Sequence, residues 1–515
     1  SQERVLSGQG GRTACGKDWV MLERFQNFID GKWVDAANGG IFDDINPANK
    51  TEVLGAFPRS DHRDVDRAVE AAKAHFPPWR RVPAPRRAEI LFRAAEILLR
   101  RKEELAELMT REMGKVLKES RGEVQEAIDM MYFIAGEGRR LWGETTPSEL
   151  PNKFAMTIRV PVGVVGMITP WNFPMAIPSW KLAPALVAGN TVVFKPAEDT
   201  PLMAVRLLEV LLEAGLPPGV VNLVHGHGEE AGAPLVRHPD VSLVSFTGSC
   251  EVGREVAIAC AAEYKRVCLE MGGKNPILVM EDADLDLAVD GAIWGGFGTS
   301  GQRCTAASRL LVHKKVVKEF TDRFVTRAQA LRLGDGRLPT TDVGPVVNEA
   351  QLKRVHSYTK VGLKEGAKLL CGGEISKEGD CRKGFFYAPT VFGDVVPKMR
   401  IAQEEIFGPT VTVLPVAGLD EAIEVANAVR YGLSSAIYTR DINKAFRAIE
   451  ALGSGITYVN ASTIGAEVHL PFGGTRQTGS GHREGGRQVL DVFTEWKTVY
   501  IDYSGKLQRA QIDMS

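Results

Sequence analysis

A cysteine in a glycine-rich segment is the residue of this chain best suited to covalent chemistry. Cys304 lies in WGGFGTSGQRCT, residues 294–305, between Arg303 and Thr305. A thiol reacts as the thiolate, which a nearby cation and exposed backbone N–H groups favour. Glycines let the backbone approach a ligand closely. A free cysteine in a tight turn would give the same pattern, so this segment alone leaves both interpretations open.

Polar or glycine-rich segments follow the apolar runs that must position such a site. The apolar runs cover residues 164–168, 191–194, 220–224, 242–246 and 266–269. Helical spacing falls between them, at residues 174–187, 200–214, 229–237 and 252–262. This alternation predicts a mostly parallel sheet with helices on both faces. Ligands of such sheets bind beyond the carboxyl ends of the strands, where TPWNFP, KPAEDTP, FTGSCEVG and LEMGGKNP occur.

Other segments predict a scaffold on both sides of this unit. Asp30-Gly31 suits a type I′ turn in a hairpin over residues 28–33. Helices are expected over residues 64–74, 86–113 and 120–141, and a strand over 154–160 that Pro161 ends. A second α/β unit is expected with strands near residues 277–280, 309–312, 411–415, 435–438 and 456–459.

Composition excludes several classes of protein. The chain has 515 residues, enough for two or three domains, and a net charge of -1, which gives no field for nucleic acid or an anionic membrane. Its 7 cysteines lack paired spacing, which argues against a disulfide framework and a zinc site. No apolar run reaches bilayer length and the N-terminus lacks a secretory h-region. We therefore expect a cytoplasmic protein without a metal.

Seven segments together resemble the NAD(P)-dependent aldehyde dehydrogenase superfamily: TPWNFP, KPAEDTP, FTGSCEVG, LEMGGKNP, GQRCT, EEIFGP and PFGG. The match extends from about Phe25 to Tyr503, and the spacing of LEMGGKNP to GQRC is its most specific part. The resemblance implies an α/β fold with a Rossmann-like parallel-sheet cofactor domain, an α/β catalytic domain and a β-hairpin oligomerisation arm. Its implied divisions are a leader (1–24), an NAD-binding domain (25–142 and 161–273), a catalytic domain (274–474), the arm (143–160 and 488–503) and a C-terminal tail (504–515).

The resemblance also implies a reaction and three catalytic residues. An aldehyde, with semialdehydes among the candidates, would be oxidised to the carboxylic acid by hydride transfer to NAD(P)+. Cys304 would form the thiohemiacetal and the thioester, and Glu270 would activate the hydrolytic water. Asn172 and the Cys304 N–H would stabilise the oxyanion. Two other classes remain open, a thiol acyl-transfer enzyme and a catalytically silent binding relative.

Cofactor contacts follow from the same resemblance. Lys195 and Glu198 would hold the adenosine ribose, and the carboxylate favours NAD, with NADP still allowed by the lysine. Pyrophosphate would lie on the helix that begins near Ser249, and Glu405 would bind the nicotinamide ribose. Cys250 departs from the family pattern, which commonly has threonine there. The remaining predicted contacts are Ile168, Thr169, Trp171, Gly248, Val252 and Phe407.

A further set of residues is predicted to determine which aldehyde the protein accepts. The predicted pocket contains Phe173, Ile177, Trp180, Arg303, Thr305 and Ser462. The loop 461–470 lacks an aromatic cluster and is more similar to loops of semialdehyde dehydrogenases. Arg303 is either a carboxylate-binding residue or a structural ion pair, with equal weight. The alternating apolar residues at 494–503, with the strand over 154–160, resemble the protruding arm of this family, and the resemblance implies a homodimer or homotetramer. The tail is expected to pack on a neighbouring subunit.

Overall fold

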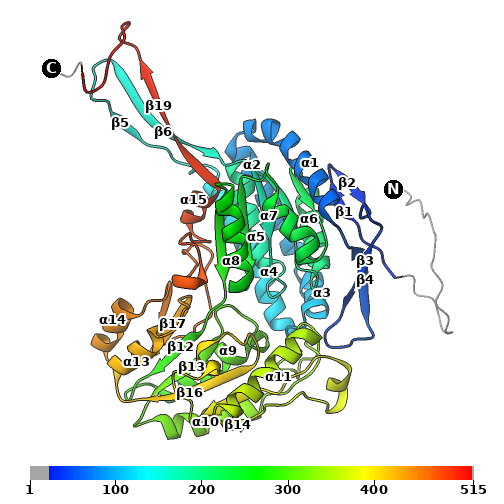
Figure 1. Ribbon diagram of the computed structural model, residues 1–515, viewed down its shortest axis with the longest axis vertical. Helices are drawn as coiled ribbons and strands as arrows, with labels where there is room; N and C mark the ends of the chain where they lie inside the picture. Colours follow the sequence, from blue (N-terminus) through cyan, green and yellow to red (C-terminus); the bar gives the residue numbers. More distant parts are fainter. Residues whose placement is uncertain (1–21, 513–515) are drawn as a thin grey trace.

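Two seven-stranded sheets form the framework of the protein (Figure 1). The structure is a computed structural model, and it describes residues 22–512. The predicted leader, residues 1–24, lies outside the described residues except for its last three. No helix among residues 22–512 has both the length and the apolar composition that crossing a bilayer requires.

The first sheet carries the predicted strand–helix alternation. Its order is β11-β10-β7-β8-β9-β1-β2, and β7 to β11 run parallel. The bounds are β1 (Asn27–Ile29), β2 (Lys32–Val34), β7 (Val164–Ile168), β8 (Thr191–Lys195), β9 (Val221–Leu223), β10 (Leu243–Gly248) and β11 (Arg266–Met271). The chain builds outward from β7 through β8 and β9, then returns to place β10 on the other side of β7. Crevices at such a reversal are the usual ligand sites of α/β sheets.

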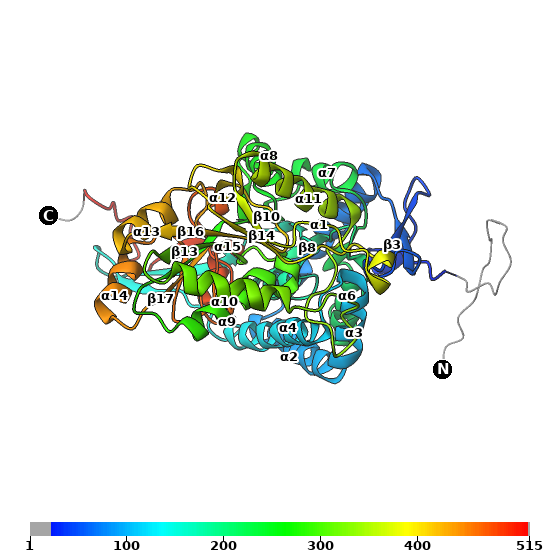
Figure 2. The ribbon, with the colours of Figure 1, turned by 90° about the horizontal axis from the view of Figure 1, so that it is seen from below.

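Helices cover both faces of this sheet, as apolar strands on both faces require. One face is covered by α1 (His62–Arg81), α7 (Ala233–Arg237) and α8 (Cys250–Ala262). The other face is covered by α2 (Ala84–Arg100), α3 (Lys102–Met113), α4 (Leu117–Glu137), α5 (Ala176–Ala188) and α6 (Pro201–Glu213). Figure 2 shows α2, α3 and α4 together on one side of the molecule and α7 and α8 on the opposite side.

The second sheet has the order β14-β15-β16-β13-β12-β17-β18, with only β14 antiparallel to its neighbour. Its strands are β12 (Asn275–Val279), β13 (Ala307–His313), β14 (Lys368–Cys371), β15 (Thr390–Gly393), β16 (Thr410–Val416), β17 (Ser434–Tyr438) and β18 (Ile456–Val459). On one face pack α9 (Leu285–Phe297) and α10 (Val317–Gln329). The other face carries α11 (Glu349–Lys364), α12 (Arg400–Gln403), α13 (Leu419–Asn427) and α14 (Ile442–Ala451).

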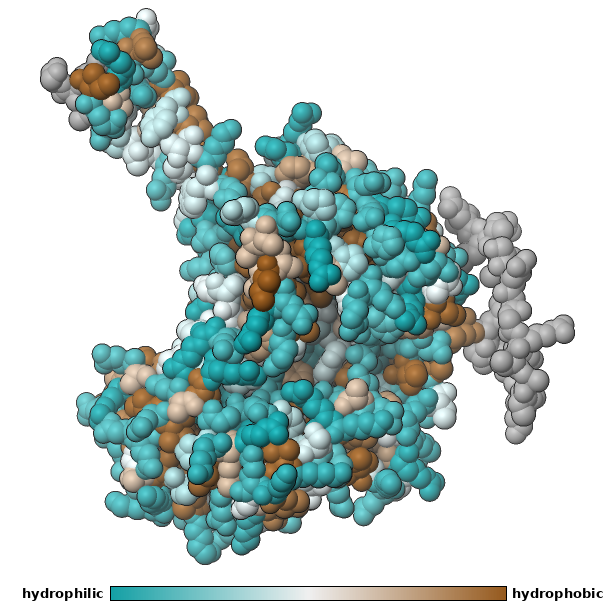
Figure 3. Space-filling model, in the orientation of Figure 1, coloured by the Kyte–Doolittle hydropathy of each residue, from teal (hydrophilic) through white to brown (hydrophobic). Residues whose placement is uncertain are grey.

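A three-stranded antiparallel arm projects from the body (Figure 1). It consists of β5 (Thr145–Pro147), β6 (Lys153–Pro161) and β19 (Thr494–Asp502), and β19 pairs with β6 over its whole length. Trp496 and Tyr500 of the arm are 51% and 65% exposed, and Figure 3 shows apolar residues among polar ones along it. In the tail, Gln508 donates to the Pro151 carbonyl of the same arm (2.8 Å).

Shorter elements complete the described chain. A separate hairpin is formed by β3 (Ile41–Ile45) and β4 (Val53–Pro58). A π-helical turn, η1 (Gly228–Gly232), precedes α7. The remaining short helices are η2 (Gly298–Gly301), η3 (Gly379–Lys383), η4 (Arg476–Thr478), η5 (Arg487–Val489) and α15 (Leu490–Phe493).

Most of the predicted helices and strands are present, but the bounds of two predicted helices need correction. The hairpin turn has positive φ at both Asp30 and Gly31 (51° and 77°), as a type I′ turn requires. The single helix predicted over 86–113 is wrong: it is two helices, α2 and α3, separated at Arg101. The helix predicted over 64–74 continues to residue 81, because Pro77 and Pro78 are accommodated inside α1.

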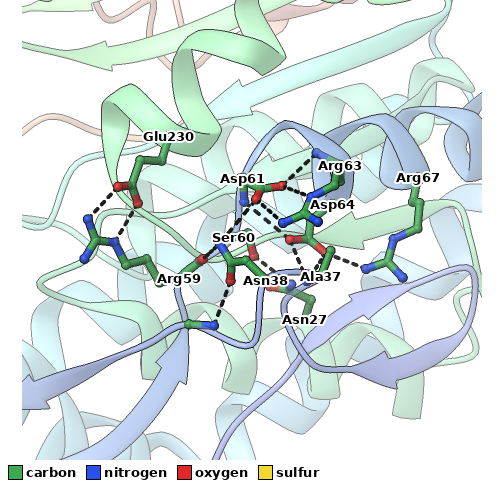
Figure 4. Close-up of polar contacts among 11 residues, drawn as sticks. Asn27, Ala37, Asn38, Arg59, Ser60, Asp61, Arg63, Asp64, Arg67 and Glu230 are labelled. Atoms are coloured by element: carbon green, nitrogen blue, oxygen red, sulfur yellow. Dashed lines mark hydrogen bonds and ion pairs between the residues drawn. The ribbon is translucent and has the colours of Figure 1, made fainter.

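A polar network fixes the start of α1 against the N-terminal hairpins (Figure 4). Asp61 caps the helix by accepting from the Arg63 N–H (3.0 Å), and Asp64 accepts from the Ala37 N–H (3.1 Å). The Asp64 side chain is fully buried and also pairs with Arg67. Burying this carboxylate is tolerable because its oxygens receive several donors. The network therefore ties a helix of the first sheet to the chain that precedes it.

We expect Asp64→Ala to lower the free energy of unfolding by roughly 2–3 kcal/mol, because charged hydrogen bonds are lost and the partly buried Ala37 N–H loses its acceptor. Urea denaturation followed by far-UV circular dichroism measures this change. Asp66→Ala, on the same helix at a half-exposed acid, is the control and should change stability by less than about 0.5 kcal/mol. Equal effects of the two substitutions would contradict the assigned role.

Candidate active site

A left-handed turn after α9 presents Cys304. Thr299, Ser300 and Gly301 all have positive φ (52°, 55° and 68°), and Glu119 accepts from the Thr299 N–H (2.8 Å). A Cβ at Gly301 would lie 2.2 Å from the Gly408 carbonyl oxygen, so this position requires glycine. The Cys304 carbonyl accepts from the Asn275 amide (2.8 Å). These contacts fix the backbone that carries the thiol.

Two cavities meet at Cys304. The first, which we call the Glu270 cavity, has a volume of about 760 Å³ and is lined by Cys304 and Glu270 among others. The second, the Glu405 cavity, has a volume of about 780 Å³ and is lined by Cys304 and Glu405 among others. Ile177, Thr247 and Met271 also line both. The sulfur thus lies where groups bound in the two cavities would meet.

The thiol of Cys304 is held in its protonated form. Burial raises its pKa to about 12, and the charges of Glu270 and Glu405 act in the same direction. Arg303 opposes this shift only weakly. The neighbouring cation therefore acts in the expected direction, towards the thiolate, but burial outweighs it in the resting site. A group that accepts the thiol proton is needed for reaction.

Glu270 lies at the end of β11 in the same cavity and is buried. Among residues 22–512, neither of its carboxylate oxygens has a hydrogen-bond partner. Burial raises its pKa well above the usual value, and the charge of Glu484 adds to the shift. Glu484 is itself buried in an ion pair with Lys181, whose Nζ also bonds the Ser245 hydroxyl (3.0 Å). Glu270 therefore binds a proton more tightly than an ordinary glutamate, which suits a proton acceptor in this cavity.

Asn172 is buried in the wall of the Glu405 cavity, which Cys304 shares. Its side-chain Nδ2 donates to the backbone carbonyl of Gln302 (3.1 Å). The backbone carbonyl of Asn172 accepts from Lys115 Nζ (2.9 Å). The amide nitrogen carries two hydrogens, so one remains for an oxygen bound beside Cys304. This arrangement suits an oxyanion donor whose position is fixed before the substrate arrives.

The predicted cofactor residues separate into two groups. Trp171, Gly248, Ser249, Glu405 and Phe407 line the Glu405 cavity. Glu405 accepts from the Gly273 N–H (2.9 Å), and burial raises its pKa to about 7. A Cβ at Gly272 would lie 2.1 Å from the Glu405 carboxylate, so only glycine allows this approach. The rings of Trp171 and Phe407 meet edge to face at 5.4 Å.

The second group lies beside that cavity at the ends of β7 and β8. Lys195 Nζ contacts the Glu198 carboxylate at 3.0 Å, and His227 lies 3.6 Å from it. Burial opposes ionisation of Glu198, but the charge and hydrogen bond of Lys195, a backbone hydrogen bond and the charge of His227 together outweigh it and lower the pKa. Ile168 pairs with Lys195 in the sheet, and Thr169 donates to the Lys195 carbonyl (3.2 Å).

The start of α8 belongs to the Glu405 cavity. Ser249 caps this helix by accepting from the Val252 N–H (3.2 Å), and its first turn leaves backbone donors free for an anion. The Val252 side chain is 47% exposed and does not line the cavity. Cys250, which departs from the family pattern, donates to the Gln477 carbonyl (3.1 Å).

Most of the predicted substrate pocket lines the Glu270 cavity, namely Phe173, Ile177, Trp180, Arg303 and Thr305. Ser462 does not: its hydroxyl donates to the Gly291 carbonyl (2.8 Å), and the loop contributes Gly465 and Ala466 instead. Sequence reasoning missed Glu126, Phe472 and Glu484 in this wall. A signal existed for Glu126, since it follows Glu119 and Glu123 along the inward face of α4.

Between pH 7 and 9, the alkylation rate of Cys304 in the cofactor-free protein should rise about tenfold per pH unit, because the thiolate fraction grows in that proportion below the pKa. Iodoacetamide labelling followed by mass spectrometry of the Cys304 peptide measures the rate. Free cysteine, with a pKa of about 8.5, should level off in the same series. A plateau for Cys304 below pH 9 would contradict a buried, protonated thiol.

Comparisons with known proteins agree with this geometry. The model of the aldehyde dehydrogenase family matches residues 33–499. Alpha-ketoglutaric semialdehyde dehydrogenase of Bacillus subtilis is 42% identical over 477 residues, which cover 93% of this chain and 98% of the relative. The 2,5-dioxopentanoate dehydrogenase of Saccharolobus solfataricus is 43% identical and covers 93% of this chain and 99% of the relative. A crystal structure of Staphylococcus aureus betaine aldehyde dehydrogenase in complex with NAD+ is 37% identical, with a TM-score of 0.92 over 94% of this chain and 96% of that one. The chain therefore belongs to the aldehyde dehydrogenase family.

Proposed function

We propose that this chain oxidises an aldehyde to the carboxylic acid, with NAD+ as the hydride acceptor and Cys304 as the nucleophile. One observation carries the proposal: Cys304 lies in the walls of both the Glu270 cavity and the Glu405 cavity. An aldehyde in the first cavity and a nicotinamide ring in the second would meet at the sulfur. Such an arrangement converts a reaction between two bound partners into an effectively unimolecular step.

The residues around the Glu405 cavity fit a dinucleotide. The capped start of α8 offers backbone N–H groups and a positive dipole end to the pyrophosphate. Glu405, brought close to Gly272, would accept from the nicotinamide ribose hydroxyls. Glu198, kept ionised by Lys195, would accept from the adenosine ribose and repel a 2′-phosphate, which favours NAD over NADP. When bound, NAD+ supplies the hydride acceptor of the reaction.

Cys304 starts the reaction by adding to the aldehyde carbon. Its proton passes to a base, and the carboxylate of Glu270, which lines the same cavity and has no hydrogen-bond partner among residues 22–512, is the candidate. The aldehyde oxygen becomes an oxyanion, which accepts from Asn172 Nδ2 and the Cys304 backbone N–H. The product is a thiohemiacetal. Loss of hydride from its carbon leaves a thioester on Cys304.

Glu270 then activates the water that hydrolyses the thioester. Its raised pKa makes it a stronger base than an ordinary glutamate. Attack of the water expels the thiol and releases the carboxylic acid. The presence of Glu270 favours hydrolysis over transfer of the acyl group to coenzyme A, because acylating relatives commonly lack this acid.

The same reasoning extends to substrate class and assembly. Relatives named as semialdehyde and 2,5-dioxopentanoate dehydrogenases support a semialdehyde as substrate. The predicted divisions at residues 142, 160, 273, 474 and 487 are proposed as domain boundaries. The exposed apolar side chains on β19 support an arm that pairs with a second copy in a homodimer or homotetramer. The proposed location is the cytoplasm.

In Glu270→Gln, we expect about one NADH per active site, formed more slowly than in the unmodified enzyme because Glu270 also accepts the Cys304 proton. Later turnovers should slow by roughly 10²–10³-fold, because the general base of hydrolysis is lost. Stopped-flow absorbance of NADH after mixing with aldehyde and NAD+ separates these two phases. Cys304→Ala should abolish both phases. Steady-state turnover of Glu270→Gln within threefold of the unmodified enzyme would refute the role of Glu270.

A further inference from the structure

We infer that Arg303 and Glu126 select aldehydes whose far end carries a carboxylate, with Arg303 binding that carboxylate and Glu126 acting as a neutral hydrogen-bond donor beside it. Both side chains line the Glu270 cavity. The inference rests on the proposed function, because it assigns specificity to the cavity in which the aldehyde would bind. It makes Arg303 and Glu126 specificity-determining residues.

The guanidinium of Arg303 is held flat at the wall of the cavity. It lies over the ring of Phe173 (5.3 Å to the centroid) and over that of Trp294 (5.0 Å). Its Nε donates to the Thr299 hydroxyl (2.9 Å), and its side chain is 14% exposed. Among residues 22–512, its Nη1 has no hydrogen-bond partner. A planar fork fixed on one edge and open on the other is the arrangement that binds a carboxylate.

The acid that faces Arg303 neutralises it only loosely. Glu119 lies 3.6 Å from Nη2, beyond hydrogen-bond distance. The same carboxylate already accepts from the Thr299 N–H (2.8 Å) and hydroxyl (3.3 Å). By contrast, Glu123, one turn after Glu119 on α4, forms a close, buried ion pair with Lys115. Arg303 is therefore the cation of this wall that retains the capacity to bind an anion.

Glu126 follows Glu123 on α4 and forms no ion pair with Arg303 among the described residues. Burial raises its pKa to about 7, and Glu123 adds to the shift. Arg303, Lys115 and the nearby Trp180 indole lower it. The other titratable groups of the cavity wall are Glu270, Cys304 and Glu484.

The protonation of Glu126 decides whether the cavity accepts an anion. In its neutral form it offers an O–H to a carboxylate or a 2-oxo group, and Arg303 is left to the substrate. When ionised, it would repel a carboxylate and compete for Arg303. Phe173, Trp180 and Phe472 supply the apolar wall that a short methylene chain needs. A cationic end would meet Arg303 and be repelled.

The first arm of the test compares 5-oxopentanoate with pentanal, which have equal chain length and differ in the terminal carboxylate. In Arg303→Met, the ratio of kcat/KM for 5-oxopentanoate to that for pentanal should fall roughly 10- to 100-fold, because a charged hydrogen-bond partner is lost. The ratio cancels any disturbance of the adjacent Cys304. Arg303→Lys should retain part of the preference. An unchanged ratio in Arg303→Met would overturn the inference.

The second arm follows the same ratio with pH in the unmodified enzyme and in Glu126→Gln. For the unmodified enzyme, the ratio should fall as pH rises from 6 to 8.5, because Glu126 ionises near pH 7. Glu126→Gln should remove this fall, whereas Asp129→Asn, an exposed acid on the same helix, should keep it. A ratio that falls equally in Glu126→Gln would overturn the role of Glu126. Failure to oxidise either aldehyde would instead refute the proposed function.

Discussion

Desolvation of ionisable groups around Cys304 is the constraint on which the site depends. Burial raises the pKa of the Cys304 thiol, of Glu270 and of Glu405. Burial disfavours the charged form of each of these groups, so the two carboxyl groups bind protons more tightly than in water and the thiol needs a base to become a thiolate. Two buried ion pairs, Lys115 with Glu123 and Lys181 with Glu484, compensate other charges that this burial removes from water.

The two sheets make that desolvation possible. The first brings Glu270 to the end of β11 and Ser249 to the end of β10, next to the reversal of strand order at β7. The second brings Cys304 to the same place through the left-handed turn after α9. Neither sheet alone holds both the thiol and the acid. Because the two sheets and their helices enclose the site from both sides, they also form the walls of the two cavities. The same packing therefore determines the reactivity of Cys304 and the access of ligands to it.

Much of this could be predicted from local sequence. The strand Val164–Ile168 was expected with its observed bounds, since a short apolar run between glycine and a polar turn allows few alternatives. Cys304, Glu270 and Asn172 were identified through the combined resemblance of several motifs to one family, and each of the other two shares a cavity wall with Cys304. Properties that depend on contacts between distant segments could not be predicted from local sequence. The high pKa of the Cys304 thiol depends on acids from other elements, and the absence of Ser462 from the wall depends on its bond to Gly291. The break at Arg101 has no proline or glycine to announce it.

The central claim is that Cys304 carries the acyl group between oxidation and hydrolysis. The most direct measurement is mass spectrometry of Glu270→Gln after rapid mixing with 5-oxopentanoate and NAD+ and quenching in acid. The account predicts the mass of the acyl group on the peptide that contains Cys304, formed in step with NADH. NADH produced without an adduct on that peptide, or with the adduct on another cysteine, would contradict it.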